Sequence, residues 1–116
     1  MPASKRIAPW THFGYTCRGY RVATDVTFEW DDDKARSSLD KHGVDFIDAA
    51  QIFFGPIMQA IDDREDYGET RIRAVGAHDG QVYVVVYTMR RNAVRLISAW
   101  KAGRHDRKSY YESVTA

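Results

Sequence analysis

A chain of 116 residues, of which 44% are apolar and 28% charged, is long enough for one domain with a modest hydrophobic core. No apolar run approaches the roughly 20 residues needed to span a bilayer, and no signal-peptide core is present, so we expect no membrane contact. Cys17 is the only cysteine, which excludes an intrachain disulfide and favours a reducing compartment, the cytoplasm.

The net charge of +1 conceals two segments of opposite sign. Residues 27–69 contain 12 acidic and 4 basic side chains, a balance of −8. Residues 70–116 contain 3 acidic and 9 basic side chains, a balance of +6. This asymmetry favours one surface for a polyanion and another for a different partner. Two solvated faces that neutralise each other are the alternative.

The first predicted elements are an irregular segment and a short strand. Residues 1–26 show no sustained period of 2 or 3.6, so the sequence predicts an irregular or disordered extension ahead of a domain formed by residues 27–116. Residues 27–30, TFEW, alternate and predict a strand.

Two helices are expected next. Asp31 or Asp32 can cap the first of them, and Gly43 is a typical left-handed terminator. Ala35, Leu39 and His42 fall on one face at helical spacing. Asp45 can cap the second helix, and its apolar stripe consists of Phe46, Ala49, Ala50 and Phe53.

The hydrophobic period then changes to that of strands. Segments 57–62, 70–77, 82–89 and 94–100 predict four strands, and 103–113 predicts a closing helix. The Asp-Gly pair within 78–81 is a strong hairpin signal, and the continuous apolar run 82–89 is typical of a central strand. The order is β-α-α-β-β-β-β-α, an α+β fold with an antiparallel sheet packed against helices.

Basic side chains recur at regular spacings in the second half. Arg71 and Arg73 lie two residues apart in a predicted strand, so they share a side. The same alternation predicts that Arg95 shares a side with Ile97, Ala99 and Lys101. In the closing helix, one face carries Arg104, Arg107, Lys108 and Tyr111.

A concave basic surface would result if the last strands and the closing helix come together. Guanidinium groups match phosphate oxygens in pairs, and tyrosine rings stack on unpaired bases, so RNA is one ligand of suitable chemistry. Pairing with the acidic segment or exposure to water is the alternative.

Cleavage of RNA without a metal needs charge stabilisation, which Arg and Lys supply, and a group that moves a proton. The candidates for proton transfer are His42, His78, His105, Glu69, Tyr87 and Tyr110. For each histidine, a structural or solvent-exposed role is the alternative, and His42 at a helix end is most simply a packed residue. The acidic clusters 31–33 and 62–66 are better explained by helix capping and a solvated turn, and no zinc spacing or phosphate loop is present, so we expect no metal or cofactor.

Three segments resemble the BrnT family of toxins. They are FEWDDDKARSSLDKHGVDFIDAAQIFFGP, ETRIRAVGAHDGQVYVVVYT and VRLISAWKAGRHDRKSYYE, and they cover about residues 27 to 112. The combination of K-H-G-V-x-F with I-S-A-x-K-A in this order is the specific part of the resemblance.

The resemblance implies the toxin of a type II toxin-antitoxin system, with a RelE-like fold and a ribonuclease activity that blocks translation. It also implies a BrnA-like ribbon-helix-helix antitoxin, with two toxins on an antitoxin dimer as a heterotetramer that reaches operator DNA only through the antitoxin. A non-catalytic module of the same fold that binds antitoxin or RNA is the alternative.

By position in these motifs, the implied catalytic residues are Arg71, Arg95 and Lys101. The same positions imply an RNA-binding role for Arg104 and Tyr110, and the basic surface adds Arg73, Arg107, Lys108 and Trp100 as expected RNA-binding residues.

The chain departs from the family pattern at a few positions. Trp100 stands where an Arg is usual, Ser38 where Asn is common, and Gly103 and Asp106 replace a Thr and a Glu. The Trp100 change removes a cation from the expected site. One hypothesis is that its indole stacks on a base while Arg95 and Arg104 supply charge for the phosphate.

Overall fold

The computed structural model describes residues 2–7, 13–15, 21–22, 26–64, 68–91 and 93–115. Within these ranges, six strands form one sheet in the order β1–β4–β8–β7–β6–β5. They are β1 (Pro2–Ile7), β4 (Val26–Asp31), β5 (Ile57–Ile61), β6 (Ile72–His78), β7 (Gln81–Arg90) and β8 (Ala93–Lys101). The predicted α+β class is confirmed, and so is an interior position for the apolar strand β7.

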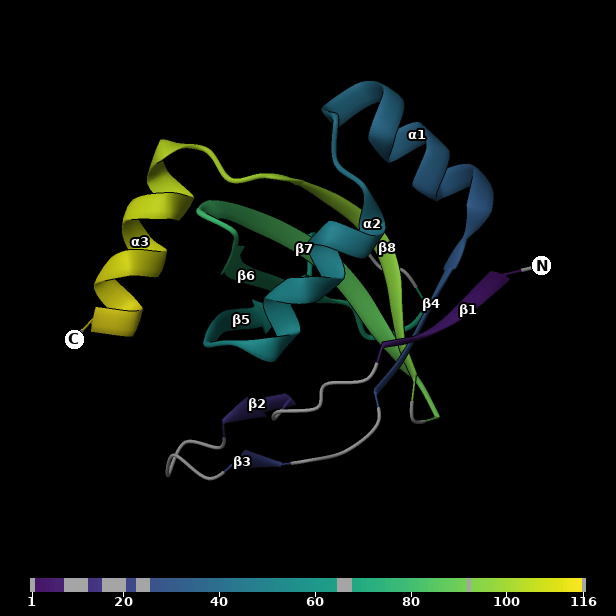
Figure 1. Ribbon diagram of the computed structural model, residues 1–116, viewed down its shortest axis with the longest axis horizontal. Coiled ribbons are helices and arrows are strands. Elements are labelled where there is room, and N and C mark those ends of the chain that lie inside the picture. The colour runs from purple at the N-terminus through teal and green to yellow at the C-terminus, as the bar shows by residue number, and fades with distance from the viewer. Residues whose placement is uncertain are drawn as a thin grey trace.

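The helices lie on both faces of this sheet (Figure 1). They are α1 (Asp32–His42), α2 (Phe46–Ala50), the 3₁₀ helix η1 (Gln51–Phe54) and α3 (Arg104–Thr115). Apolar side chains of α2 and η1 share one buried cluster with β4, β7 and β8, whereas Tyr110 of α3 belongs to a second cluster. In Figure 1, α2 and η1 lie across the sheet and α3 stands near β5 and β6.

The sheet is mixed, which corrects the prediction of an antiparallel sheet. Strands β5 to β8 form the expected antiparallel meander, but β4 pairs in parallel with β8, with Trp30 opposite Leu96. A parallel neighbour requires a long crossover connection, and here α1, α2 and the three strands of the meander supply it. The alternation of residues 27–30 predicts a strand, but it does not predict which strand pairs with it or in which direction.

The segment 1–26 forms strands in the parts that are described, in place of the irregular chain expected from its sequence. Strand β1 pairs antiparallel with β4 and forms an edge of the sheet. Strands β2 (Phe13–Tyr15) and β3 (Arg21–Val22) pair with each other in a separate two-stranded sheet. Val26 begins β4, and the other residues of 1–26 lie outside the described ranges. Backbone pairing needs no hydrophobic period, so the sequence did not reveal β1.

Helix α1 begins and ends as its sequence predicts. The carboxylate of Asp31 accepts hydrogen bonds from the backbone N–H groups of Asp33 (2.8 Å) and Lys34 (3.3 Å). The bonds from Lys34 and then Asp33 favour the ionised form, so they lower the pKa of Asp31. Gly43 ends the helix at φ 66°, a left-handed conformation that favours glycine.

The buried side of α1 differs from the predicted one. Leu39 is 50% exposed and His42 is exposed, so the expected apolar face is only partly used. Ser38 is buried instead, and its hydroxyl donates a 3.0 Å hydrogen bond to the carbonyl oxygen of Ala99 in β8. A buried hydroxyl needs such a partner, and here it fixes the helix to the strand.

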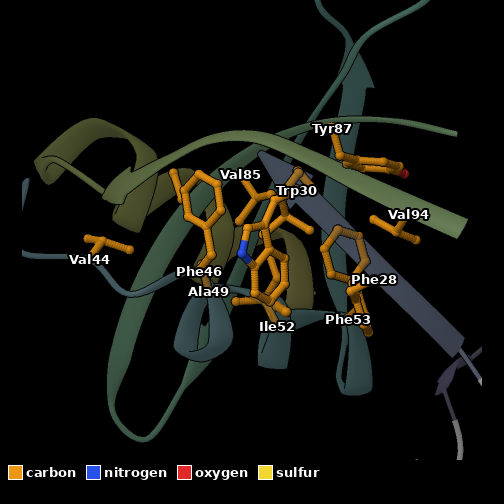
Figure 2. Close-up of a cluster of buried hydrophobic side chains, with 14 residues drawn as sticks. Phe28, Trp30, Val44, Phe46, Ala49, Ile52, Phe53, Val85, Tyr87 and Val94 are labelled. Atoms are coloured by element: carbon orange, nitrogen blue, oxygen red, sulfur yellow. The ribbon is translucent and has the colours of Figure 1, made fainter. Parts of the chain in front are cut away.

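The apolar stripe predicted for one helix is divided between α2 and the 3₁₀ helix η1, and both pack on this face of the sheet. Phe46 packs edge-on against Trp30 at 5.9 Å, and Phe53 lies 5.6 Å from Phe28 and 5.0 Å from Tyr87. Figure 2 shows these rings between the helical segment and the strands. Burial of several aromatic rings in one cluster is the largest favourable contribution visible in the fold.

The hairpin between β6 and β7 has the predicted Asp-Gly turn. Asp79 and Gly80 both have positive φ, 52° and 80°, which is the requirement of a type I′ turn. His78 pairs with Gln81 on either side of it. This turn sets the register that places the arginine side chains of β6.

Gly76 marks a close approach between β6 and η1. A Cβ at this position would lie 2.7 Å from Cβ of Ile52 and 3.0 Å from Cγ2 of Ile57. We expect Gly76→Ala to lower the free energy of unfolding by about 1–3 kcal/mol, because a rigid core must move to admit the methyl group. Urea denaturation measures this. Gly55→Ala is the matched control, since nothing lies within 4 Å of its Cβ and its φ is negative. Equal effects of the two changes would contradict the explanation.

Candidate functional site

Alternation along the strands gives the sheet two chemically different faces. On β7, Val85 and Tyr87 pack in the cluster formed with α2 and η1, whereas Val82 and Val84 pack in the cluster that contains Tyr110 of α3. We call the side of the sheet that packs against α2 and η1 the helix face, and the side that carries Val82, Val84 and Tyr110 the arginine face. The arginine face is defined by the side chains that share the orientation of Val84 in the paired strands: Arg71, Arg73, Thr88, Arg90, Arg95, Glu29, Ser98 and Trp100.

Register places these side chains in successive rows across the sheet. Trp100 pairs with Val84, and Arg73 and Ser98 flank Val86 in the next row. Adjacent strands are about 4.8 Å apart and rows on one face about 7 Å apart. Arg73 and Ser98 therefore lie in one row on either side of Val86, with Trp100 in the next row, although Arg73 precedes Ser98 by 25 positions in the sequence.

A β-bulge in β8 changes which residues accompany Arg95. Val86 pairs with Ser98 but Tyr87 pairs with Leu96, so Ile97 is an extra residue in the strand. Beyond the bulge the alternation is reversed. Arg95 therefore shares its face with Ser98 and Trp100, and the prediction that it shares a side with Ala99 and Lys101 is wrong.

Lys101 consequently lies on the helix face. It pairs with Tyr83, which packs against the cluster of that face, and its side chain is exposed. The structure thus separates Lys101 from Arg71 and Arg95, with which the motif positions grouped it. Simple alternation cannot detect this, because a bulge of one residue leaves no clear mark in the sequence.

The next row contains two of the arginines. Arg95 lies between Thr88 on β7 and Glu29 on β4. Arg71 directly precedes β6, whose pairing with β7 ends at Ile72 opposite Tyr87, so extension of the register by one residue brings it opposite Thr88. The hydroxyl of Thr88 donates a 2.7 Å hydrogen bond to the carbonyl oxygen of Thr70, and Arg71 and Arg90 contact the same carboxylate, Glu69. Arg71, Arg73 and Arg95 thus share one face, as the basic-surface interpretation requires.

Each arginine of this face contacts a carboxylate. The nitrogen–oxygen distances are 2.7 Å for Arg73 and Asp106, 3.4 Å for Arg95 and Glu29, 3.3 Å for Arg71 and Glu69, and 3.8 Å for Arg90 and Glu69. These ion pairs keep several cations close together, and they also orient the guanidinium groups. An anionic ligand would have to compete with the carboxylates.

The sequence predictions missed Glu29 and Asp106 as partners of the site arginines. They lie 66 and 33 positions away from Arg95 and Arg73, respectively. No local spacing connects such residues. Only the parallel pairing of β4 with β8, and the packing of α3 beside β6, bring them together.

Helix α3 presents its basic residues to solvent. Arg104, Arg107 and Lys108 are exposed, and Arg107 also donates a 3.2 Å hydrogen bond to the carbonyl oxygen of Ala102. Tyr111 is 46% exposed. The predicted exposed basic face of this helix is confirmed.

Tyr110 has a packing role instead of the surface role implied by its motif position. It is 4% exposed in the second cluster, and its hydroxyl donates a 2.9 Å hydrogen bond to the carbonyl oxygen of Pro56. Burial raises the pKa of its hydroxyl. The ring therefore attaches α3 to the start of β5 and is not available for stacking on a base.

The remaining candidates for proton transfer lie away from the arginine face. His42 and His105 are exposed on α1 and α3, and His78 shares the orientation of Ile72 on the helix face. The hydroxyl of Tyr87 donates a 2.7 Å hydrogen bond to Oε1 of Gln59, and burial raises its pKa. Burial also raises the pKa of Tyr83, with added repulsion from Asp48 and Asp79.

Within the described ranges, no three His, Cys, Asp or Glu side chains are grouped as metal ligands would be. In the same part of the chain, none of the helices has the length and apolar character needed to cross a membrane.

Comparison with known proteins identifies a family for most of the chain. No curated protein matches the chain. The family model described as the ribonuclease toxin BrnT of type II toxin-antitoxin systems matches residues 30–106. This range extends from Trp30 near the end of β4 to Asp106 in α3, so it includes β6, β7 and β8 with the arginines of the arginine face, whereas Glu29 precedes it. The chain therefore belongs to the BrnT family of ribonuclease toxins of type II toxin-antitoxin systems.

Proposed function

We propose that the arginine face is the RNA-cleaving surface of a metal-independent endoribonuclease that blocks translation in the cytoplasm. The observation that carries this proposal is the common orientation of Arg71, Arg73 and Arg95 on one face of the sheet. We assign this ribonuclease unit to residues 27–116, in a RelE-like arrangement, with residues 1–26 as an addition.

The chemistry of RNA cleavage explains how arginines can stabilise the transition state without a metal ion. Attack of a 2′-hydroxyl on the adjacent phosphate builds negative charge on the phosphorane, and fixed cations stabilise that charge more strongly than they stabilise the substrate. Arg71 and Arg95 lie in one row and take the catalytic role. Arg73, one row away, holds a neighbouring phosphate.

The RNA would extend from this row toward Trp100. Its indole is only partly buried and lies on the same face as Ser98, so it offers a ring on which a base can stack. The exposed Arg104, Arg107 and Lys108 of α3 add cations for more distant phosphates. Trp100 thus contributes binding in place of the Arg usual in the family.

The same surface accounts for neutralisation. A BrnA-like antitoxin with a ribbon-helix-helix part can cover the arginines with acidic side chains, which blocks the substrate with the same contacts. Two toxins on an antitoxin dimer would form a heterotetramer, and operator DNA would contact the antitoxin alone.

A non-catalytic module that binds antitoxin or RNA is the second candidate. It is favoured by the carboxylate that contacts each site arginine and by the indole of Trp100 where a cation is usual. Such a module would bind RNA or antitoxin without breaking a bond.

Purified protein incubated with single-stranded RNA in excess EDTA distinguishes the two candidates. We expect fragments that end in a 2′,3′-cyclic phosphate, no cleavage of an RNA with 2′-deoxyribose at the cleaved position, and inhibition of a cell-free translation reaction. Cleavage that requires added Mg²⁺ would contradict the metal-independent mechanism. RNA binding without cleavage would support the module.

A further inference from the structure

The arginine face offers few groups that could accept a proton. Within the described residues, the histidines lie elsewhere, Lys101 is on the opposite face, and Tyr110 is buried with its hydroxyl donating to the carbonyl oxygen of Pro56. The ion pairs described for its arginines involve three carboxylates, Glu29, Glu69 and Asp106. If this face cleaves RNA, the proton acceptor for the 2′-hydroxyl should be one of them.

Glu29 is enclosed by the sheet. It lies on β4 between β1 and β8, opposite Arg95, and both side chains are only 17% exposed. A carboxylate in the middle of paired strands has little freedom to reach a substrate hydroxyl. Its contact with Arg95 suits a role in orienting that guanidinium group.

Asp106 is committed to a short contact between helix and sheet. Its carboxylate lies 2.7 Å from Arg73, with 22% exposure, at the start of α3. A short charge-assisted hydrogen bond of this kind holds the carboxylate in place against the guanidinium group. It also fixes α3 beside β6, which is a structural role.

Glu69 has the properties that the other two lack. It is 31% exposed, the largest fraction of the three, and it precedes β6, so no strand pairing restricts its side chain. Its contacts are longer, 3.3 Å to Arg71 and 3.8 Å to Arg90. The two arginines approach different oxygens, Oε2 and Oε1, so a phosphate that they bind would lie beside the carboxylate.

We propose that Glu69 is the general base of RNA cleavage, an inference that rests on the proposed function. Glu69 takes the proton of the 2′-hydroxyl as the bond from O2′ to phosphorus forms. The bond from phosphorus to O5′ breaks, and O5′ takes a proton from water. The hydroxide that remains recovers the proton from Glu69, so the enzyme is restored and the products are a 2′,3′-cyclic phosphate and a 5′-hydroxyl.

Glu69→Gln tests this role, because the amide keeps the size of the side chain but cannot accept the proton. We expect kcat to fall about 10²–10⁴-fold, the range of general-base catalysis, with KM changed less than about threefold. Glu112→Gln is the matched control, because it makes the same chemical change at an exposed position of α3 that has no role in the proposed site, and we expect it to keep kcat within about tenfold. Glu69→Asp retains a carboxylate and should recover part of the lost rate.

The pH dependence separates a base from a positioning residue. The described charged groups that contact Glu69 are Arg71 and Arg90. In the wild type, kcat should decrease toward acidic pH, and this decrease should be absent in Glu69→Gln. Melting curves of each variant verify folding.

Wild-type cleavage with full activity of Glu69→Gln would overturn the inference alone, as would a loss confined to KM or an unchanged decrease toward acidic pH. Absence of wild-type cleavage would overturn the proposed function, and this inference with it.

Discussion

Replacement of Arg71 by alanine should lower kcat/KM for RNA cleavage by about 10²–10³-fold, the usual effect of removing one group that stabilises transition-state charge. The same change should abolish growth arrest when the toxin is expressed. The cause is electrostatic: the guanidinium lies on the arginine face in the row of Arg95, where the phosphorane forms under our proposal.

Stability should change little in this variant. Arg71 is 23% and Glu69 31% exposed, and solvent-accessible ion pairs contribute roughly 0–1 kcal/mol. A gel-based cleavage assay measures the rate, and thermal melting verifies folding. Arg36→Ala is the matched control, because it removes an exposed arginine from α1. If both variants cleave RNA at the same rate, Arg71 has no catalytic role.

Replacement of Phe53 by alanine should lower the free energy of unfolding by about 3–5 kcal/mol. Phe53 is 2% exposed and contacts Phe28 and Tyr87, so its removal leaves a cavity between η1 and the sheet. This is a large part of the roughly 5–15 kcal/mol that stabilises a typical domain. Toxicity should therefore be lost through unfolding, with no change in the chemistry of the arginine face.

Urea denaturation measures the effect, and Leu39→Ala is the matched control. Leu39 is half exposed on α1, so its truncation should change the free energy of unfolding by less than about 0.5 kcal/mol. A Phe53→Ala protein as stable as the control would show that the aromatic cluster does not determine stability. Comparison with Arg71→Ala separates loss of fold from loss of catalysis.

Local sequence patterns were sufficient to predict where helices and strands occur in residues 27–115. The cap at Asp31, the left-handed Gly43 and the turn at Asp79 and Gly80 depend on neighbouring residues, so they can be recognised in sequence. The same holds for the buried stripe of α2 and the interior strand β7. Periodicity also placed Arg71 and Arg73 on one side of a strand.

Other features depend on contacts between distant residues, which no local pattern encodes. The parallel pairing of β4 with β8 brings Glu29 to Arg95, and the packing of α3 brings Asp106 to Arg73. Tyr110 is buried because α3 docks at Pro56, although its helical position alone is equally suited to the surface.

The sequence by itself determined the family, the α+β class and the basic character of the second half of the chain. The tertiary structure decided which basic residues act together. One extra residue in β8, Ile97, reverses the side-chain alternation, so Arg95 accompanies Ser98 and Trp100 while Lys101 is turned to the other face. The physical reason is that a strand has a period of two, and a single-residue bulge exchanges the faces of every residue that follows it.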